Sequence, residues 1–271
     1  MIKRPIVFAT AVCLVTSFTM VFQPMPAVNA QTLDRIEANR AIFHQDYDEW
    51  MGIRKNGRAQ AVLPPKDPEK VVYLTFDDGP DPKWTPLILN VLARYQARAT
   101  FFMIGYNAVS HPEVVREIAS RGQTISVHGF NHVDLSGVGY TYFYNEVHDT
   151  ELAIVEPFQG NPELIKQFGR CFRPPYGKKS DLLYANAEAM GYEVSMWNID
   201  TQDWSGLGPD EIFVHFKSAL EPRKVILMHD GGLDRANSVR ALELILHELL
   251  MQGYTVLPYC TQHGQAIKTY D

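Results

Sequence analysis

Two aspartates and two histidines in the sequence have the types and spacing of metal ligands. Asp77 and Asp78 follow an apolar, β-rich run at residues 71–76 and open a Gly-Pro turn. Successive side chains of an extended chain point to opposite sides, so one carboxylate can ligate a metal while the other faces a water molecule. Taken alone, Asp-Asp-Gly-Pro is more often only a turn, so this motif needs support from the rest of the chain.

His128 and His132 follow a later apolar run, at residues 124–127. Two histidines at i and i+4 can converge on one ion from a helical turn or a tight loop. The spacing alone is a weak signal, because two solvent-facing imidazoles produce the same pattern. Two histidines and one aspartate would leave coordination positions open for water and substrate, as in a catalytic zinc site.

Three further polar clusters follow apolar runs. They are Arg173-Pro174-Pro175-Tyr176-Gly177, the segment 197–204 with Asp200, Asp203 and Trp204, and Leu227-Met228-His229-Asp230. The two prolines of the first cluster stiffen the backbone around Arg173 and Tyr176. Each cluster alone could be a rigid loop or the polar end of a strand. Five clusters at equivalent places are harder to explain in that way.

The elements that must position these clusters follow from the apolar pattern. Strands are expected at residues 71–76, 99–104, 124–127, 171–172, 193–199, 225–228 and 254–257, and helices at 86–95, 112–120, 144–158, 180–190, 209–220 and 238–251. Alternating strands and helices imply parallel βαβ units, and about seven such units favour a (β/α) barrel over an open sheet. The clusters lie where predicted strands end, the edge at which sites form in parallel α/β folds.

The first thirty residues have the features of a secretory signal peptide. Lys3 and Arg4 precede an apolar run at residues 5–22, and small residues precede a cleavage site after Ala30. A membrane anchor is the alternative, although the run is near the lower length limit for a span. We therefore expect a periplasmic or extracellular protein with no stable membrane insertion after cleavage. The expected organisation is a signal peptide at 1–30, an extension and linker at 31–69, and one catalytic domain at 70–271.

The composition indicates a folded, acidic protein. Hydrophobic residues make up 46% of the chain, which excludes a disordered class, and 25 basic against 31 acidic residues give a net charge of −6. Beyond Ala30 the balance is 23 basic against 31 acidic residues, or −8, which argues against nucleic acid as a partner. Cys171 and Cys260 remain after export, and one disulfide or two separate buried thiols suit the sequence equally.

At these motifs the chain resembles the polysaccharide deacetylases, carbohydrate esterase family four, which share the nodulation-type deacetylase domain. The motifs TFDDGP, HxxxH, RPPYG, DxxDW and LxHD occur in this order, and the resemblance covers residues 70–258. One departure is Gly129, where the family usually has a Ser or Thr whose hydroxyl is expected to steady the metal loop. The resemblance implies an α/β fold, a distorted (β/α) barrel with about seven parallel strands in a single catalytic domain.

The resemblance also implies a metal and a base. Asp78, His128 and His132 would hold a divalent ion, most simply Zn²⁺, with Co²⁺ as an alternative. The ion would polarise the acetyl carbonyl and the attacking water. Asp77 would be the general base, paired with Arg173.

The resemblance also implies roles for the remaining matched residues, which would act on the leaving group or contact the acetyl group. His229 would be the general acid, oriented by Asp200. The backbone N–H of Tyr176 would stabilise the tetrahedral oxyanion. Leu227 and Trp204 would form apolar walls, and Asp203 would pair with Arg173.

By this resemblance the protein would be a metal-dependent hydrolase of carbon–nitrogen bonds other than peptide bonds, and we also expect it to be exported and monomeric. Its substrate would be an acetylated glycan with GlcNAc units, such as peptidoglycan, chitin oligomers or poly-N-acetylglucosamine. An O-acetyl esterase of the same family, acting on xylan-type polymers, is an alternative, because one site can attack either carbonyl. A non-catalytic carbohydrate-binding relative is disfavoured, since base, acid and metal ligands are all present. The aromatic segment 140–144 could stack on sugar rings or pack in the core.

Overall fold

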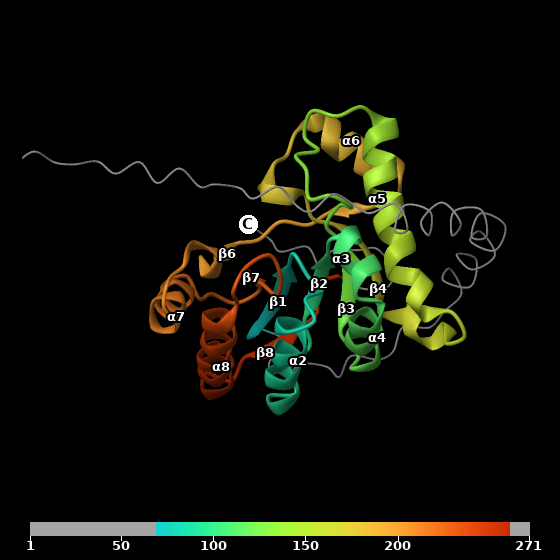
Figure 1. The fold of residues 1–271 in the computed structure, drawn as a ribbon. Coiled ribbons are helices and arrows are strands. Elements are labelled where there is room, and N and C mark those ends of the chain that lie inside the picture. The colour runs from blue at the N-terminus through green and yellow to red at the C-terminus, as the bar shows by residue number, and fades with distance from the viewer. Residues whose placement is uncertain (1–68, 261–271) are drawn as a thin grey trace, which may run out of the picture.

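One parallel sheet forms the centre of the computed structural model, which describes residues 69–260 (Figure 1). Its strands are β1 Val71–Asp77, β2 Thr100–Met103, β3 Thr124–Val127, β4 Phe168–Phe172, β5 Glu193–Val194, β6 Ile199–Asp200, β7 Val225–His229 and β8 Thr255–Leu257. The strand order is β5-β4-β3-β2-β1-β7-β6, and β8 pairs with the first residues of β1. Every strand pairing in this part of the chain is parallel.

The sheet curls into a distorted barrel, which confirms the predicted fold class. The two ends of the strand order, β5 and β6, are joined by the short segment 195–198. Ser195 N still donates to Phe172 O on the β4 side (2.8 Å), whereas Asn198 N already donates to Val225 O on the β7 side (3.0 Å). The single strand predicted at 193–199 is therefore wrong, because its backbone changes partner halfway and crosses the opening between the two edges.

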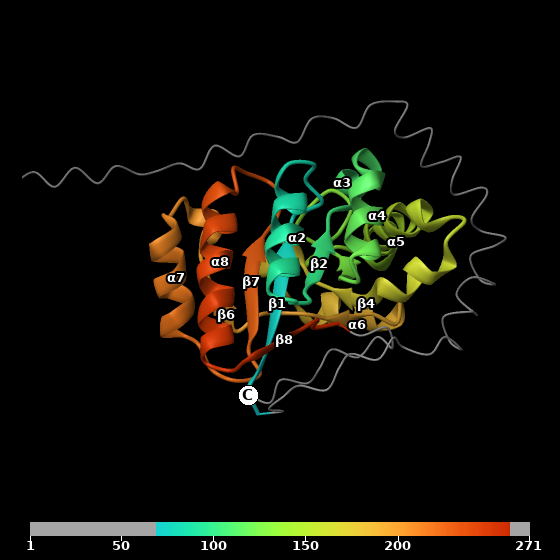
Figure 2. The same cartoon turned by 90° about the horizontal axis from the view of Figure 1, so that it is seen from below.

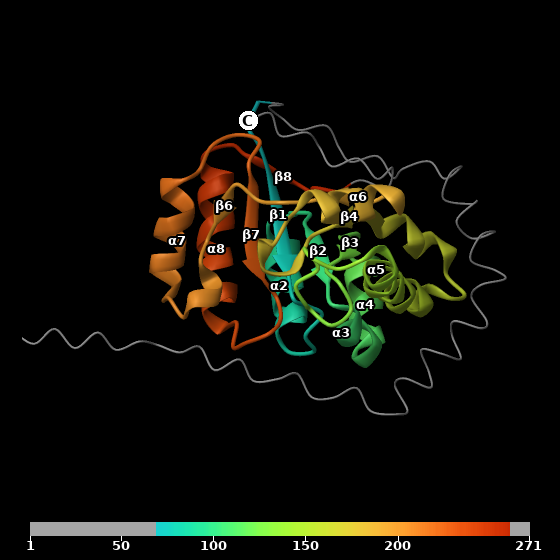
Figure 3. The same ribbon diagram turned by 90° about the horizontal axis from the view of Figure 1, so that it is seen from above.

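Helices cover the outside of the curled sheet. They are α2 Trp84–Arg94, α3 Gly105–Ser110, α4 Pro112–Ser120, α5 Tyr140–Val155, α6 Asp181–Ala189, α7 Pro209–Ser218 and α8 Ala236–Met251. Figures 2 and 3 show α7, α8, α2 and α4 side by side along the strands. The predicted helix at 112–120 is confirmed to the residue. The short α3 was not predicted, because six residues are too few for a periodic pattern.

The core lies between the sheet and these helices. All seven residues of β1 are buried, and α8 buries Leu242, Ile245 and Leu249 along one stripe at helical spacing. Each such side chain stabilises the fold by about 1.5–3 kcal/mol. In the aromatic segment, Phe143 packs into this core, as one of the two expectations had it, while Tyr140 and Tyr142 are exposed on α5 and their stacking on sugar rings stays a prediction.

A disulfide joins Cys171 of β4 to Cys260, which follows β8. It decides between the two possibilities that the sequence left open. No helix among residues 69–260 is both long and apolar enough to cross a membrane. The predicted signal peptide and nearly all of the predicted extension lie outside the described residues and stay predictions.

Candidate metal centre and active site

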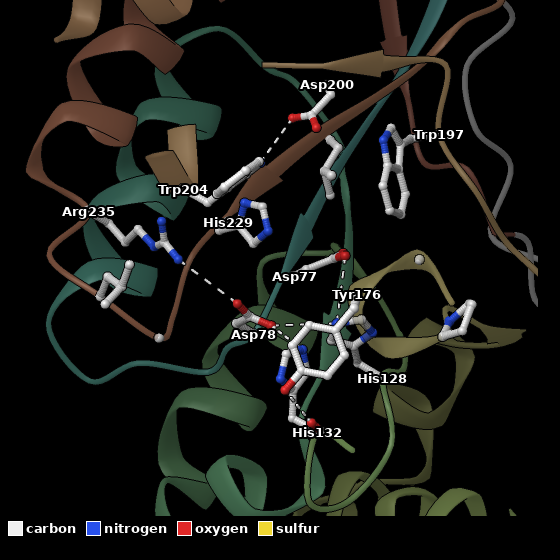
Figure 4. Close-up of a pocket in the computed structure, with 15 residues that line it drawn as sticks. Asp77, Asp78, His128, His132, Tyr176, Trp197, Asp200, Trp204, His229 and Arg235 are labelled. Atoms are coloured by element: carbon white, nitrogen blue, oxygen red, sulfur yellow. Dashed lines mark hydrogen bonds and ion pairs between the residues drawn. The ribbon is translucent and has the colours of Figure 1, made fainter. Parts of the chain in front are cut away.

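A pocket of about 490 Å³ opens where β1, β3 and β7 end (Figure 4). Nine of the ten predicted site residues line it: Asp77, Asp78, His128, His132, Tyr176, Asp200, Trp204, Leu227 and His229. The tenth, Arg173, lies fully buried beside Asp77. The five clusters therefore meet at one mouth, as parallel βα units predict.

Asp78, His128 and His132 form a triad whose ligand atoms all lie within 4.8 Å of one another. Asp78 Oδ1 is 3.2 Å from His132 Nε2 and 3.5 Å from His128 Nε2. The Nδ1 of His128 lies 2.8 Å from Arg173 O and donates to it, which turns Nε2 toward the aspartate. Asp78 Oδ1 is buried without a hydrogen-bond partner. Two imidazole nitrogens around such an oxygen fit a divalent cation with open coordination positions.

The charges in the triad also suit a cation. Burial lowers the pKa of His132, and the charge of His128 lowers it further, to about 4, so its ring is neutral at pH 7 and keeps a lone pair for a ligand bond. Burial raises the pKa of Asp78, but its contact with His128 and the charges of His229, His132 and His128 outweigh burial, and the net pKa lies below the ordinary 3.8. Burial lowers the pKa of His128, yet the Asp77 and Asp78 carboxylates raise it overall. The site thus attracts positive charge.

The backbone of the site is held in unusual conformations. Asp78, His132 and Tyr176 have φ angles of 74°, 54° and 59°, in the left-handed region that side chains rarely adopt. Such conformations cost about 1–3 kcal/mol each and persist only where the surrounding structure imposes them. Their gathering around one pocket indicates a pre-organised functional site.

The predicted contact between Asp77 and Arg173 is present. Arg173 Nη1 donates to Asp77 Oδ1 at 2.7 Å and to Thr75 Oγ1 at 2.8 Å. Arg173 also donates to Ser195 O at 3.3 Å, which fixes the guanidinium inside the barrel. The other oxygen, Asp77 Oδ2, lies 3.8 Å from His128 Nε2. Asp77 is therefore anchored by one oxygen and presents the other to the triad.

His229 is oriented by Asp203, so the prediction that Asp200 does this is wrong. Asp203 Oδ1 lies 2.7 Å from His229 Nδ1, and Asp203 Oδ2 accepts from the His229 backbone N–H at 3.0 Å. Asp200 Oδ1 instead accepts from Gln202 N and from Trp204 Nε1. The predicted Asp203–Arg173 pair is also wrong.

The conformation of the turn after β6 explains why Asp203, and not Asp200, pairs with His229. Gln202 adopts a left-handed conformation (φ 56°) and leads into the short helix η4, Asp203–Ser205. This turn buries the Asp203 carboxylate at the end of β7 and leaves Asp200 on the pocket wall. Two carboxylates three residues apart look equivalent in the sequence, because the turn geometry that distinguishes them is not a local pattern.

The pairing changes the protonation of His229. Burial lowers its pKa, but the hydrogen bond and the negative charge of Asp203 outweigh burial and raise the pKa to about 9. Burial raises the pKa of Asp203, and its bond with His229 outweighs this and lowers it overall. At neutral pH the imidazole is therefore protonated and able to donate a proton.

Arg235 is a site residue that sequence reasoning missed. It is only 2% exposed, lines the pocket, and places Nη2 3.9 Å from Asp78 Oδ2 (Figure 4). Its Nε donates to Gly231 O at 2.7 Å, and its Nη1 reaches Asp203 O at 3.5 Å. The guanidinium thus lies between the triad and the His229–Asp203 pair, where it offsets the negative charges of Asp78 and Asp203. In the sequence it is an ordinary arginine just before a helix.

Asp230 follows His229 in the sequence, and the motifs predict no role for it. It is buried, and its Oδ2 accepts from the Thr85 hydroxyl at 2.5 Å. Burial raises its pKa to about 7. A Cβ at Gly79 would overlap this carboxylate, which explains why glycine follows the two aspartates of the first motif.

The comparisons with known proteins agree with this geometry. A family model described as polysaccharide deacetylase matches residues 65–195, which include Asp77, Asp78, both triad histidines and Arg173. A peptidoglycan-N-acetylglucosamine deacetylase of Bacillus cereus is 37% identical over 188 residues, which cover 69% of this chain and 84% of the relative. A chitooligosaccharide deacetylase of a Bradyrhizobium species is 32% identical over 204 residues, covering 71% of this chain and 90% of the relative.

A solved structure is also similar to this chain. It is a peptidoglycan N-acetylglucosamine deacetylase in complex with 4-naphthalen-1-yl-N-oxidanyl-benzamide. Its TM-score is 0.64 at 32% identity, and the match covers 69% of this chain and 85% of that one.

Proposed function

The chain belongs to the polysaccharide deacetylase family, and from this membership we propose that it hydrolyses the N-acetyl groups of a glycan that contains N-acetylglucosamine. The relatives named above are peptidoglycan and chitooligosaccharide deacetylases, which supports this substrate class. One observation carries the proposal. A single pocket holds an Asp-His-His triad, an arginine-paired carboxylate and a carboxylate-paired histidine, which can serve as metal ligands, general base and general acid in the hydrolysis of an amide.

Asp78, His128 and His132 would hold the divalent ion, for which we favour Zn²⁺ because of the donor set. When bound, such an ion supplies Lewis-acid polarisation of the acetyl carbonyl and acidifies the attacking water. Asp77 takes a proton from that water, with Oδ2 directed toward the triad and Oδ1 held by Arg173. The backbone N–H of Tyr176 is assigned to the developing oxyanion.

His229 protonates the departing amine. Its Nδ1 is bonded to Asp203, which leaves Nε2 as the nitrogen that carries the transferable proton into the pocket. The amide C–N bond breaks, water supplies the new oxygen of acetate, and the proton on nitrogen comes from His229. Leu227 and Trp204 line the pocket as apolar walls that suit the acetyl methyl group.

Acetate release from a substrate panel tests the proposed activity. The panel contains peptidoglycan, chitooligosaccharides, poly-N-acetylglucosamine and acetylated xylan, each with and without a chelator. We expect chelator-sensitive release from at least one GlcNAc polymer, with recovery after Zn²⁺ is added back. Release from xylan alone would instead identify an O-acetyl esterase. Metal binding without release from any substrate would identify a non-catalytic relative.

Replacing the ligand His128 by alanine should weaken divalent-ion binding by at least about 100-fold, since it removes one of three protein ligands. Metal content after dialysis, measured by elemental analysis, checks this. His247→Ala is the control, because His247 is an exposed histidine on α8 outside the pocket. Full metal content in the His128 variant would remove this residue from the ligand set.

We further propose that the protein is exported and acts as a monomer outside the cytoplasm. The basic start, apolar run and small-residue site within residues 1–30 support export. N-terminal sequencing of the secreted protein should then begin at Gln31. A secreted chain that still begins at Met1 would contradict the cleavage.

A further inference from the structure

The metal-binding loop, residues 128–132, contains two of the three triad residues and needs support to hold them. Gly129 and His132 both have positive φ angles, 83° and 54°. For His132 this conformation is unfavourable, so neighbouring groups must impose it. The hydrogen bonds of the loop backbone identify these groups.

The carbonyl groups of the loop are bonded by α3 and by Tyr176. Gly105 N and Tyr106 N, at the start of α3, donate to Gly129 O (3.0 Å) and Phe130 O (3.1 Å). Tyr176 Oη donates to His132 O at 2.9 Å. These bonds fix one side of the loop backbone. The backbone amides of Phe130 and Asn131 lie on the opposite side of the loop and point toward α5.

Glu146 of α5 takes those amides. Its side chain is buried (4% exposed), and Oε2 accepts from Phe130 N and from Asn131 N, both at 2.9 Å. Its Oε1 accepts from Asn131 Nδ2 at 2.7 Å. One buried carboxylate thus makes three hydrogen bonds to two successive residues of the loop. Bonds to a charged acceptor are the stronger kind.

Gly129 makes this support more important, because glycine has no side chain to brace the loop. A Cβ built at this position would lie 3.7 Å from Glu146 Oε2 and 3.6 Å from Pro175 Cγ. The carboxylate therefore occupies the space next to the loop that a short polar side chain at 129 would reach. Helices α3 and α5 contact each other (Figure 1), and both bond to the loop, α3 through its first backbone amides and α5 through Glu146.

We propose that Glu146 is a positioning residue that sets the geometry of the metal-binding loop and, through His128 and His132, the affinity of the site for metal. This inference rests on the proposed metal site, although it concerns a residue that does not touch the metal. Partners that orient metal ligands typically change metal affinity 10–100-fold when they are removed.

The test uses the full chain, stripped of metal, and titrates it with Co²⁺ against a competing chelator. Glu146→Gln keeps the size of the side chain but removes its negative charge, so its hydrogen bonds to Phe130 N and Asn131 N are no longer charge-assisted. We expect Co²⁺ affinity to fall about 10-fold in this variant and up to about 100-fold in Glu146→Ala. The visible absorption spectrum of bound Co²⁺ should change as well, because the imidazoles are held less uniformly.

A second substitution separates positioning from general stability. Glu146→Gln combined with Asn131→Asp reverses donor and acceptor, so the glutamine NH₂ can donate to the new carboxylate, and the net charge equals that of the natural chain. We expect this double variant to recover most of the Co²⁺ affinity and the original spectrum. Glu211→Gln is the matched control, since Glu211 makes the same kind of carboxylate bond, to Gly208 N at 2.8 Å, at the start of α7.

The outcomes distinguish the two proposals. Unchanged Co²⁺ affinity and spectrum in both Glu146 variants would overturn the positioning role. So would a loss of affinity that Glu211→Gln reproduces, or that the double variant fails to reverse. If the natural chain binds Co²⁺ at the triad and the Glu146 variants weaken it, the positioning role stands even where no glycan releases acetate, and only the proposed activity fails.

Discussion

Asp77→Asn should reduce acetate release by about 10³-fold or more, while the protein keeps its metal. Asp77 Oδ1 accepts a bond from Arg173, and an asparagine oxygen can still do so, so the fold around the barrel interior is preserved. An amide in place of Oδ2 cannot take a proton from water next to the triad. The loss should therefore fall on kcat and not on substrate binding.

Parallel assays of acetate release and of metal content measure this effect. Asp210→Asn, an exposed change on α7, is the control and should behave like the natural protein. Activity within a few-fold of normal in Asp77→Asn would show that another group is the base. Loss of metal together with activity would show that Asp77 is itself a ligand.

Asp203→Asn should lower activity at neutral pH by about 10²–10³-fold, because it deprives His229 of its proton. In the natural protein the pKa of His229 is raised to about 9, chiefly because the Asp203 bond and charge outweigh burial. Without that charge, burial still lowers the pKa of His229, which should therefore fall toward or below its ordinary value near 6.5. The imidazole would then be neutral at the pH of the assay.

The sign of the pH dependence follows from the direction of this shift. A histidine pKa raised in the folded state stabilises the protein fully below the unfolded value near 6.5, and this contribution is lost as pH rises through about 9. NMR titration of His229 in the metal-free protein should show the high pKa, and stability should decline over the same range. Asp203→Asn should remove this dependence.

Asp200→Asn is the informative comparison, since Asp200 is the other acid of the same motif. Its carboxylate bonds to Gln202 N and Trp204 Nε1 and not to His229, so the pKa of His229 should stay high and activity should change only a few-fold. If Asp200→Asn lowers the pKa and Asp203→Asn does not, the assignment of Asp203 as the positioning residue is wrong.

Several features of this protein could be predicted from the sequence because they depend on local patterns. The helix at 112–120 and the strand at 124–127 were predicted to the residue, since each has its own apolar period and clear ends. The meeting of the Asp77-Asp78 pair with His128 and His132 also followed, because these motifs follow predicted strands and parallel strands end at one edge, and the family motifs then implied Asp78 as the ligand. The Asp77–Arg173 contact followed from the family motifs.

Other features could be recognised only in the folded chain. The choice of Asp203 over Asp200 depends on a left-handed turn at Gln202. Arg235 reaches the site from the position just before α8, and Glu146 supports the metal-binding loop from α5. Neither residue lies in a sequence motif. The Cys171–Cys260 pairing spans 89 residues.

The sequence by itself determined the succession of strands and helices, the edge at which the chemistry lies, and the residues that form the triad. The first two features follow from apolar periodicity and from the common direction of parallel strands, both of which are properties of short segments, whereas the choice of Asp78 over Asp77 for the triad came from the resemblance to the polysaccharide deacetylases. Only the tertiary structure decided which carboxylate serves His229, which arginine balances the pocket, and which glutamate braces the metal-binding loop. Those contacts join residues 15 to 157 positions apart, and they depend on turn angles and helix packing that no local pattern records.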